Sequence, residues 1–310
     1  MYVGFLTACL PKTPLEEKIE WAAKHGIKAL EVACWPREND RDYSSSDIDV
    51  ANLTQAEADD IMARFKANGL ELSSLGYYDN NLDHDPVRRA FVNRHTKKCI
   101  DAAAMLGVNL VGTFVGRNID KSIKDNFDDM ELVFTDLLQY AESRGVRLMI
   151  ENCPMEGWQL PGQPGTISFT PELWEEMFRR VPSKSFGLNF DPSHLYFQLI
   201  DYVPLISQFK DRIFHVHAKD AEIFEDRLHY YGAFNAQLTR DGYWRFRMPG
   251  LGKVDFPAMI QALKEIGYDG VISIEHEDPL YEGTDAKVYE GLELGRDYLN
   301  KVLKDAGCLD

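Results

Sequence analysis

Short β-rich apolar runs alternate eight times with longer segments of helical period along this chain. No other feature of the sequence restricts the fold as strongly. This alternation is typical of repeated βα units around a parallel sheet. The predicted strands cover residues 2 to 8, 28 to 34, 71 to 77, 109 to 115, 147 to 152, 186 to 191, 213 to 218 and 270 to 276. A doubly wound sheet usually has fewer strands, and it carries a GxGxxG fingerprint that is missing after the first strand here. The pattern therefore predicts an α/β fold, a single (β/α)8 TIM barrel that forms one domain over residues 1–310.

Start and stop signals support the predicted helices. The segment TPLEEKIEWAAKHG has Thr13 as its expected N-cap, Pro14 as its first helical residue and Gly26 as its stop. Two connections are longer than usual, residues 35 to 55 and a long loop after strand seven at residues 219 to 250. Long βα loops lie over the active face of a barrel, so we expect both to shape a substrate pocket.

Composition excludes several classes of partner. The chain has 34 Lys and Arg against 50 Asp and Glu, a formal net charge of −16, which disfavours nucleic acid and anionic membrane surfaces. Its five cysteines form no CxxC pair, which is typical of reduced thiols in the cytoplasm. No apolar run reaches the roughly 18 residues of a membrane span, and the first ten residues lack the basic region of a signal peptide. We therefore expect a cytoplasmic protein with neither nucleic acid nor membrane as a partner.

Four polar residues stand at the C-terminal ends of the fifth to eighth predicted strands: Glu151, Asp191, His217 and Glu275. The ends of neighbouring barrel strands meet at one mouth, so these side chains are expected to converge where a divalent cation could bind. Three carboxylates and one imidazole favour one Mn²⁺ ion, with Mg²⁺, Co²⁺ or Zn²⁺ as alternatives. The competing interpretation is that such residues only pair with lysines or cap the next helix.

The motifs IEN, DPSH, HVHAKD and IEHED, in that order along the chain, resemble the xylose isomerase-like TIM-barrel superfamily. That superfamily includes sugar and keto-sugar epimerases, inosose dehydratases and isomerases, and endonuclease IV. The resemblance implies that Glu151, Asp191, His217 and Glu275 bind one metal ion and that Glu151 and Glu275 are the catalytic acid/base pair. In such chemistry a divalent cation stabilises the enediolate that forms when a proton α to a carbonyl leaves, and two glutamates on opposite faces take and return the proton.

Further residues are expected at the substrate. His194 matches the DPSH element, and we expect it to contact substrate or support the site, with a second metal ion as the alternative. The resemblance suggests that Lys219 reaches substrate oxygens, whereas the competing interpretation is a surface pair with Asp220. Six more candidates lie at strand ends or in the long loop: Glu31, Tyr77, Phe114, Arg117, His229 and Arg247. For Tyr77 and Phe114 the alternative is core packing.

The leading hypothesis is a metal-dependent isomerase or epimerase that acts on a keto-sugar, an inosose or a related polyol in carbohydrate metabolism. The same first step serves a lyase or dehydratase that eliminates from a 3-oxo-glycoside or an inosose. A DNA repair enzyme similar to endonuclease IV is a third class, against which the acidic charge argues. The aromatic and arginine-rich loop at 219 to 250 suits a polyol or glycoside, and it equally suits an interface in a homo-oligomer or with a partner subunit.

Overall fold

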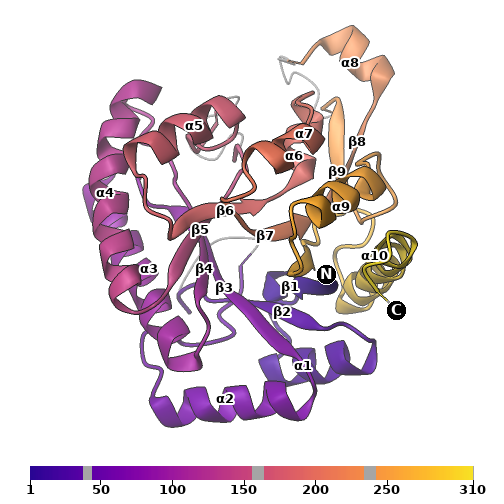
Figure 1. Ribbon diagram of the computed structural model, residues 1–310, viewed down its shortest axis with the longest axis horizontal. Coiled ribbons are helices and arrows are strands. Elements are labelled where there is room, and N and C mark those ends of the chain that lie inside the picture. The colour runs from indigo at the N-terminus through magenta and orange to yellow at the C-terminus, as the bar shows by residue number, and fades with distance from the viewer. Residues whose placement is uncertain (38–43, 156–163, 234–241, 310) are drawn as a thin grey trace.

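A computed structural model describes residues 1–37, 44–155, 164–233 and 242–309. Eight parallel strands form a closed barrel in the order β1-β10-β7-β6-β5-β4-β3-β2 (Figure 1). Their bounds are Tyr2–Leu6 (β1), Ala29–Ala33 (β2), Glu71–Asn80 (β3), Leu110–Phe114 (β4), Arg147–Glu151 (β5), Phe186–Phe190 (β6), Ile213–Ala218 (β7) and Val271–Ile274 (β10). The predicted (β/α)8 barrel is confirmed, and each of its strands overlaps the apolar run that predicted it.

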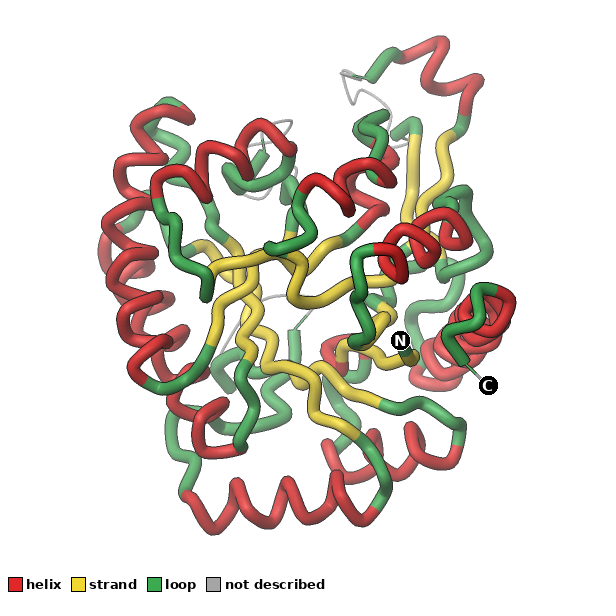
Figure 2. The backbone as a smooth tube through the Cα atoms, in the orientation of Figure 1, coloured by secondary structure: helices red, strands yellow, loops and turns green. Residues whose placement is uncertain are grey.

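Helices surround the barrel in the order expected of βα units (Figure 2). Their bounds are Leu15–Lys24 (α1), Gln55–Ala67 (α2), Pro86–Leu106 (α3), Ile123–Ser143 (α4), Pro171–Arg180 (α5), Pro192–Phe197 (α6), Val203–Gln208 (α7), Phe256–Glu265 (α9) and Asp285–Asp305 (α10), with a short 3-10 turn at Thr7–Cys9 (η1). The predicted cap of α1 was wrong. Pro14 holds the N-cap position, and the Thr13 hydroxyl lies 3.2 Å from Asp285 Oδ2 at the start of α10 instead.

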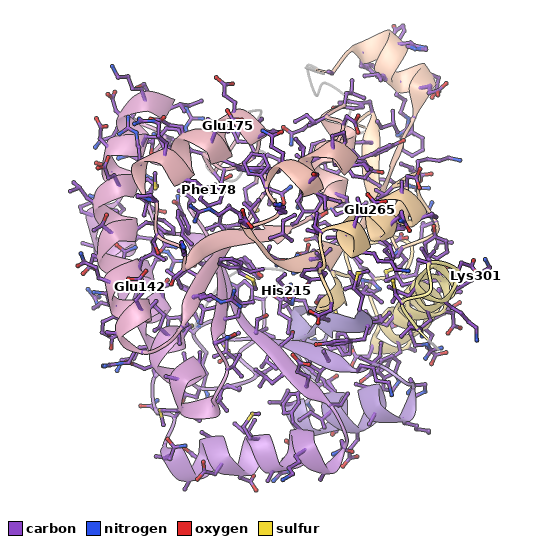
Figure 3. The ribbon with its side chains drawn as sticks, in the orientation of Figure 1. Glu142, Glu175, Phe178, His215, Glu265 and Lys301 are labelled. Carbon is purple, nitrogen blue, oxygen red and sulfur yellow. The ribbon has the colours of Figure 1, made fainter. Side chains whose placement is uncertain are left out.

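A polar layer crosses the barrel interior beneath its mouth. His215, labelled in Figure 3, is buried, and its Nδ1 lies 3.0 Å from Asn189 Oδ1. Burial lowers the pKa of His215 to about 4, so its ring is neutral at pH 7. Gly112 leaves room for the neighbouring Tyr78, because a Cβ at this position would lie 2.3 Å from the Tyr78 hydroxyl. The absence of a side chain at Gly112 therefore lets the Tyr78 hydroxyl lie in the barrel interior.

The stretch after β7, expected to be a long loop, contains regular structure over much of its length. Strands β8 (Asp220–Ile223) and β9 (Trp244–Arg247) pair antiparallel, and helix α8 (Glu225–Tyr231) follows β8. The Asp220 carboxylate accepts hydrogen bonds from the backbone amides of residues 221, 250, 252 and 254, which fixes the return of the chain towards α9. Helix α8 projects from the barrel in Figure 1. Among the described residues, no helix is both long and apolar enough to cross a membrane.

Candidate active site

The four strand-end residues converge at the mouth of the barrel. Glu151 closes β5, Asp191 follows β6, His217 lies in β7 and Glu275 follows β10. One potential ligand atom from each lies within 4.8 Å of the others. All four side chains are buried. Buried carboxylates are costly unless a cation or hydrogen bonds compensate them, so compensating groups must lie close to this cluster.

Asp191 is held in place by its own neighbours. Asn152 and the backbone of Asp191 exchange two hydrogen bonds of 2.8 Å, and Ser193 donates to Asp191 Oδ1 from its amide and its hydroxyl. The second oxygen, Oδ2, is buried and accepts no hydrogen bond from any residue in the described ranges. This oxygen, which accepts no hydrogen bond from the described part of the chain, belongs to a donor set of three carboxylates and one imidazole that fits a hard divalent cation.

The Lys219 ammonium lies among these carboxylates. Its Nζ is 2.6 Å from Glu275 Oε2, 2.9 Å from Glu277 Oε2 and 3.5 Å from Asp191 Oδ2. Burial alone would lower the pKa of Lys219, but Glu275 and Glu277 hold it well above its usual value. The ring of Phe246 on β9 covers this ammonium at 4.4 Å. Lys219 is therefore a buried cation of the site, and the alternative of a surface pair with Asp220 does not describe it.

Glu31 fixes the orientation of His217. Its Oε2 lies 2.8 Å from His217 Nε2, which leaves Nδ1 facing Glu151 and Glu275 at 3.2 Å each. The Tyr78 hydroxyl donates to Glu31 Oε1 at 2.5 Å. A histidine that binds a metal ion commonly donates its other ring N–H to a carboxylate. The structure therefore places Glu31 beneath His217, where it would position a ligand.

The two glutamates that flank His217 Nδ1 have opposite pKa shifts. Burial alone would raise the pKa of Glu151, but Lys219, His194 and His217 hold it well below its usual value. Burial and the charge of Glu151 raise the pKa of Glu275 to about 7. Environments that separate the pKa values of two neighbouring carboxyl groups are typical of acid/base pairs.

His194 lies beside the cluster on α6. Its Nε2 is 3.3 Å from Glu151 Oε1 and 3.7 Å from Asp191 Oδ2. The Cys153 sulfur, a ring nitrogen of His194 and a carboxylate oxygen of Glu151 form a second group of potential ligand atoms within 4.8 Å. Sequence reasoning missed Cys153, although it stands two residues after Glu151. The ring of Phe246 meets that of His194 edge to face at 5.3 Å between centroids.

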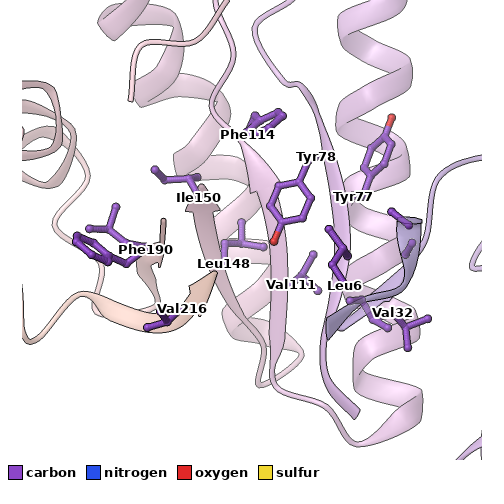
Figure 4. Packing of buried hydrophobic residues seen from close by; sticks show 14 of the residues in the cluster. Leu6, Val32, Tyr77, Tyr78, Val111, Phe114, Leu148, Ile150, Phe190 and Val216 are labelled. Atoms are coloured by element: carbon purple, nitrogen blue, oxygen red, sulfur yellow. The ribbon is translucent and has the colours of Figure 1, made fainter. Parts of the chain in front are cut away.

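The structure brings Tyr78, and not Tyr77, into the barrel. Tyr77 points to the outer face of β3, where its ring lies 4.5 Å from that of His95 on α3 (Figure 4). Tyr78 points inward, with its ring 5.3 Å from that of Phe114. The two tyrosines are adjacent in β3, so they lie on opposite faces. Phe114 is buried beside Tyr78, a residue that alternation along β3 could have identified, and its contact with substrate stays a prediction.

Three other candidates lie away from the four clustered side chains. Arg117 Nη1 donates to the carbonyl of Pro164 at 3.2 Å. Arg247 pairs with Glu222 and Asp278, at 3.0 and 2.9 Å, and joins β9 to the loop after β10. His229 is exposed on the projecting helix α8. Along β9 it is Phe246 that faces the site, since alternate residues of a strand point to opposite sides.

Comparisons with known proteins identify relatives over most of the chain. The family described as xylose isomerase-like TIM barrel matches residues 19–298. An inosose isomerase of Bacillus velezensis is 25% identical over 275 residues, which cover 88% of this chain and 86% of the relative. An inosose dehydratase of Lacticaseibacillus casei is 29% identical over 207 residues, 63% of this chain and 65% of the dehydratase. A protein of Methanocaldococcus jannaschii is 26% identical over 162 residues, and the chain spans 45% of its length.

Solved structures share the fold. An IOLI protein with a bound zinc atom has a TM-score of 0.70 at 21% identity, and the match covers 99% of this chain and 98% of that one. A 3-keto-D-glucoside 4-epimerase of E. coli has a TM-score of 0.69 at 16% identity, and the match covers 98% of this chain and 99% of that one. Because the family match spans most of the sequence and the barrel agrees with it, this chain belongs to the xylose isomerase-like TIM barrel family.

Proposed function

We propose that this chain is a metal-dependent isomerase or epimerase that removes and returns a proton α to the carbonyl of a keto-sugar, an inosose or a related polyol. One observation carries the proposal. Glu151 and Glu275 each lie 3.2 Å from the same atom, His217 Nδ1, so two carboxyl groups flank one buried position between strands β5, β7 and β10. Relatives named inosose isomerase and inosose dehydratase support this substrate class.

The proposed metal ion is a single divalent cation held by Glu151, Asp191, His217 and Glu275, with Mn²⁺ as the expected ion and Mg²⁺, Co²⁺ or Zn²⁺ as alternatives. When bound, it would supply Lewis-acid polarisation of the substrate carbonyl. The zinc atom in the related IOLI protein supports a metal ion in this fold. Manganese is preferred here because carboxylate oxygens dominate the donor set.

The residues of the chain take complementary parts. Glu151 is the ionised carboxylate and takes the proton, while Glu275 is the carboxyl group that gives one back on the other face. Lys219 lies 2.6 Å from Glu275, where its ammonium would donate a hydrogen bond to a substrate oxygen and stabilise developing negative charge. Phe246 covers the Lys219 ammonium and helps to exclude water from it.

A dehydratase is the second candidate, and the match to an inosose dehydratase favours it. Both reactions begin by removal of an α proton, and they differ in whether a group on the next carbon then leaves. The experiment is to incubate the metal-loaded protein with an inosose and with keto-hexoses in D₂O and to follow both sugars by NMR. Deuterium at the α carbon without loss of water supports the isomerase or epimerase, and release of water supports the dehydratase.

Two variants and a matched control make this experiment specific. Glu151→Gln should abolish deuterium exchange, whereas Glu275→Gln should abolish formation of the isomerised or epimerised product, because Glu151 can still exchange the proton that it removes. Glu265→Gln changes an exposed glutamate on α9 (Figure 3) and should leave exchange at the wild-type rate. Near-normal exchange in Glu151→Gln, or near-normal product formation in Glu275→Gln, would contradict the acid/base assignment.

A further inference from the structure

A cleft of about 460 Å³ opens beside the candidate active site. The segment after β1 forms one wall through Ala8, Pro11 and Lys12, and the loop after β10 with the first turn of α10 forms the other. Its volume lies within the usual range of ligand pockets, about 300–1,000 Å³. The residues that line it include none of the four expected metal ligands, so the cleft extends beyond the reacting centre.

Two side chains join the cleft to the active site. Phe246 and Glu277 both line the cleft. The same two side chains contact Lys219, Phe246 at 4.4 Å from its ring centroid to Nζ and Glu277 at 2.9 Å from Oε2 to Nζ. A ligand bound at the metal ligands and Lys219 could therefore continue past Phe246 into the cleft.

His276 packs between the wall of the cleft and helix α10, where a Cβ on Gly291 would lie 2.7 Å from its Nε2. The side chain lines the cleft and is only 1% exposed, yet neither ring nitrogen has a hydrogen-bond partner among the described residues. Buried polar groups without partners are costly. Besides His276, the cleft is lined by groups that accept hydrogen bonds from hydroxyl groups, namely the carboxylates of Glu277, Glu282 and Asp285 and the hydroxyl of Thr284.

Charge and apolar surface narrow the class of ligand. Glu277, Glu282 and Asp285 line the cleft against the single ammonium of Lys12, so phosphate and carboxylate groups are repelled. Ala8, Val288 and Phe246 supply an apolar wall. Aromatic faces pack well on the apolar face of a ring that carries polar groups at its edge. The combination suits an uncharged ring with several hydroxyl groups.

We propose that this cleft is a subsite for a second, uncharged polyhydroxylated ring, so that the substrate is a keto-glycoside and not a free keto-sugar. This inference rests on the proposed function, because it places the reacting ring at Glu151 and Glu275. The second ring extends from the reacting ring past Phe246 and reaches Glu282.

The test compares two uncharged probes, 3-keto-glucose and a disaccharide whose non-reducing ring carries the 3-keto group. The kcat/KM for deuterium exchange should be at least about tenfold higher for the disaccharide than for 3-keto-glucose. Glu282→Trp places an indole at the exposed edge of the cleft and should reduce this preference about tenfold. Glu265→Trp, on the outer face of α9, should leave the preference unchanged. Equal kcat/KM for the two probes, or an unchanged preference in Glu282→Trp, would overturn the subsite.

Two further measurements separate the subsite from the chemistry. Calorimetry with an unoxidised disaccharide follows binding without reaction, and Glu282→Trp should weaken that binding whereas Glu265→Trp should not. A disaccharide with a phosphate on its second ring should bind more weakly than the uncharged one, and Glu282→Lys should reduce the difference. If neither keto probe and no inosose or keto-hexose exchanges its proton while Glu282→Trp still weakens disaccharide binding, the proposed function fails and the subsite stands. If no disaccharide binds, the subsite is refuted.

Discussion

Replacing Glu31 with Gln should weaken metal binding although Glu31 is not one of the four expected ligands. Its carboxylate accepts a hydrogen bond from the Tyr78 hydroxyl and lies 2.8 Å from His217 Nε2. The negative charge holds Nδ1 of the same ring towards Glu151 and Glu275. A neutral amide keeps the size of the side chain but loses this charge, so the ring becomes less basic at Nδ1 and freer to turn.

The magnitude follows from what such partners contribute elsewhere. Removing the carboxylate that orients a metal-bound histidine typically reduces metal affinity about 10–100-fold, which corresponds to about 1.4–2.8 kcal/mol. We expect Glu31→Gln to fall in this range. Tyr78→Phe removes the donor to Glu31 Oε1 and the acceptor of Asn189 Nδ2, but it keeps the charge of Glu31 and should have a smaller effect in the same direction.

The assay is a calorimetric titration of the metal-free protein with Mn²⁺, carried out for the wild type and for each variant. Glu277→Gln is the matched control for charge, because it removes a carboxylate that contacts Lys219 at 2.9 Å instead of His217. If Glu31→Gln bound Mn²⁺ as tightly as the wild type, the claim that Glu31 orients a metal ligand would be refuted. A circular dichroism spectrum identical to that of the wild type would exclude unfolding as the cause of a loss.

Three other perturbations test the energetics of the site and its supports. Lys219→Met leaves Glu275 and Glu277 without their shared cation, so the metal-free variant should lose about 3–5 kcal/mol of unfolding free energy in thermal denaturation. Saturating Mn²⁺ should recover part of this loss, and unchanged stability would contradict the buried ion pairs. Asp220→Ala leaves four backbone N–H groups without their acceptor and should cost about 3 kcal/mol or more in urea unfolding, whereas a change below about 1 kcal/mol would show that water replaces the carboxylate. Gly112→Ala should displace Tyr78, whose hydroxyl lies 2.3 Å from the new Cβ position, and should lower stability by about 1–3 kcal/mol; a wild-type melting curve would show that Tyr78 moves freely.

The barrel and the convergence of four side chains could be predicted because both depend on simple periodicities. Eight apolar runs separated by helical segments are enough to predict βα units, and closure of the barrel brings the ends of neighbouring strands to one mouth. Glu151, Asp191, His217 and Glu275 stand at such ends, so their approach follows from topology alone. The partner of Lys219 does not follow in this way, because it depends on where a long side chain turns in three dimensions.

The residues whose positions differ from the sequence-based expectation do so for local physical reasons. Tyr77 was expected at the pocket because the predicted third strand ended there, but β3 continues to Asn80 and its alternation turns Tyr78 inward. The hairpin β8–β9 has strands of four residues each, too short to give a clear period of two. Arg247 was therefore assigned to the pocket, whereas its neighbour Phe246 faces Lys219. Glu31 was expected to contact substrate, and only the tertiary structure places it beneath His217.

The central claim is that Glu151, Asp191, His217 and Glu275 hold one divalent metal ion on which proton transfer by Glu151 and Glu275 depends. The most direct measurement is the metal content of the protein purified without added metal, beside that of a Glu151→Gln, Glu275→Gln double variant. We expect about one divalent ion per chain in the wild type, with Mn²⁺ as the expected ion, and its loss in the double variant. Equal metal content in both proteins, or a wild type that binds no divalent ion when Mn²⁺ is supplied, would contradict it.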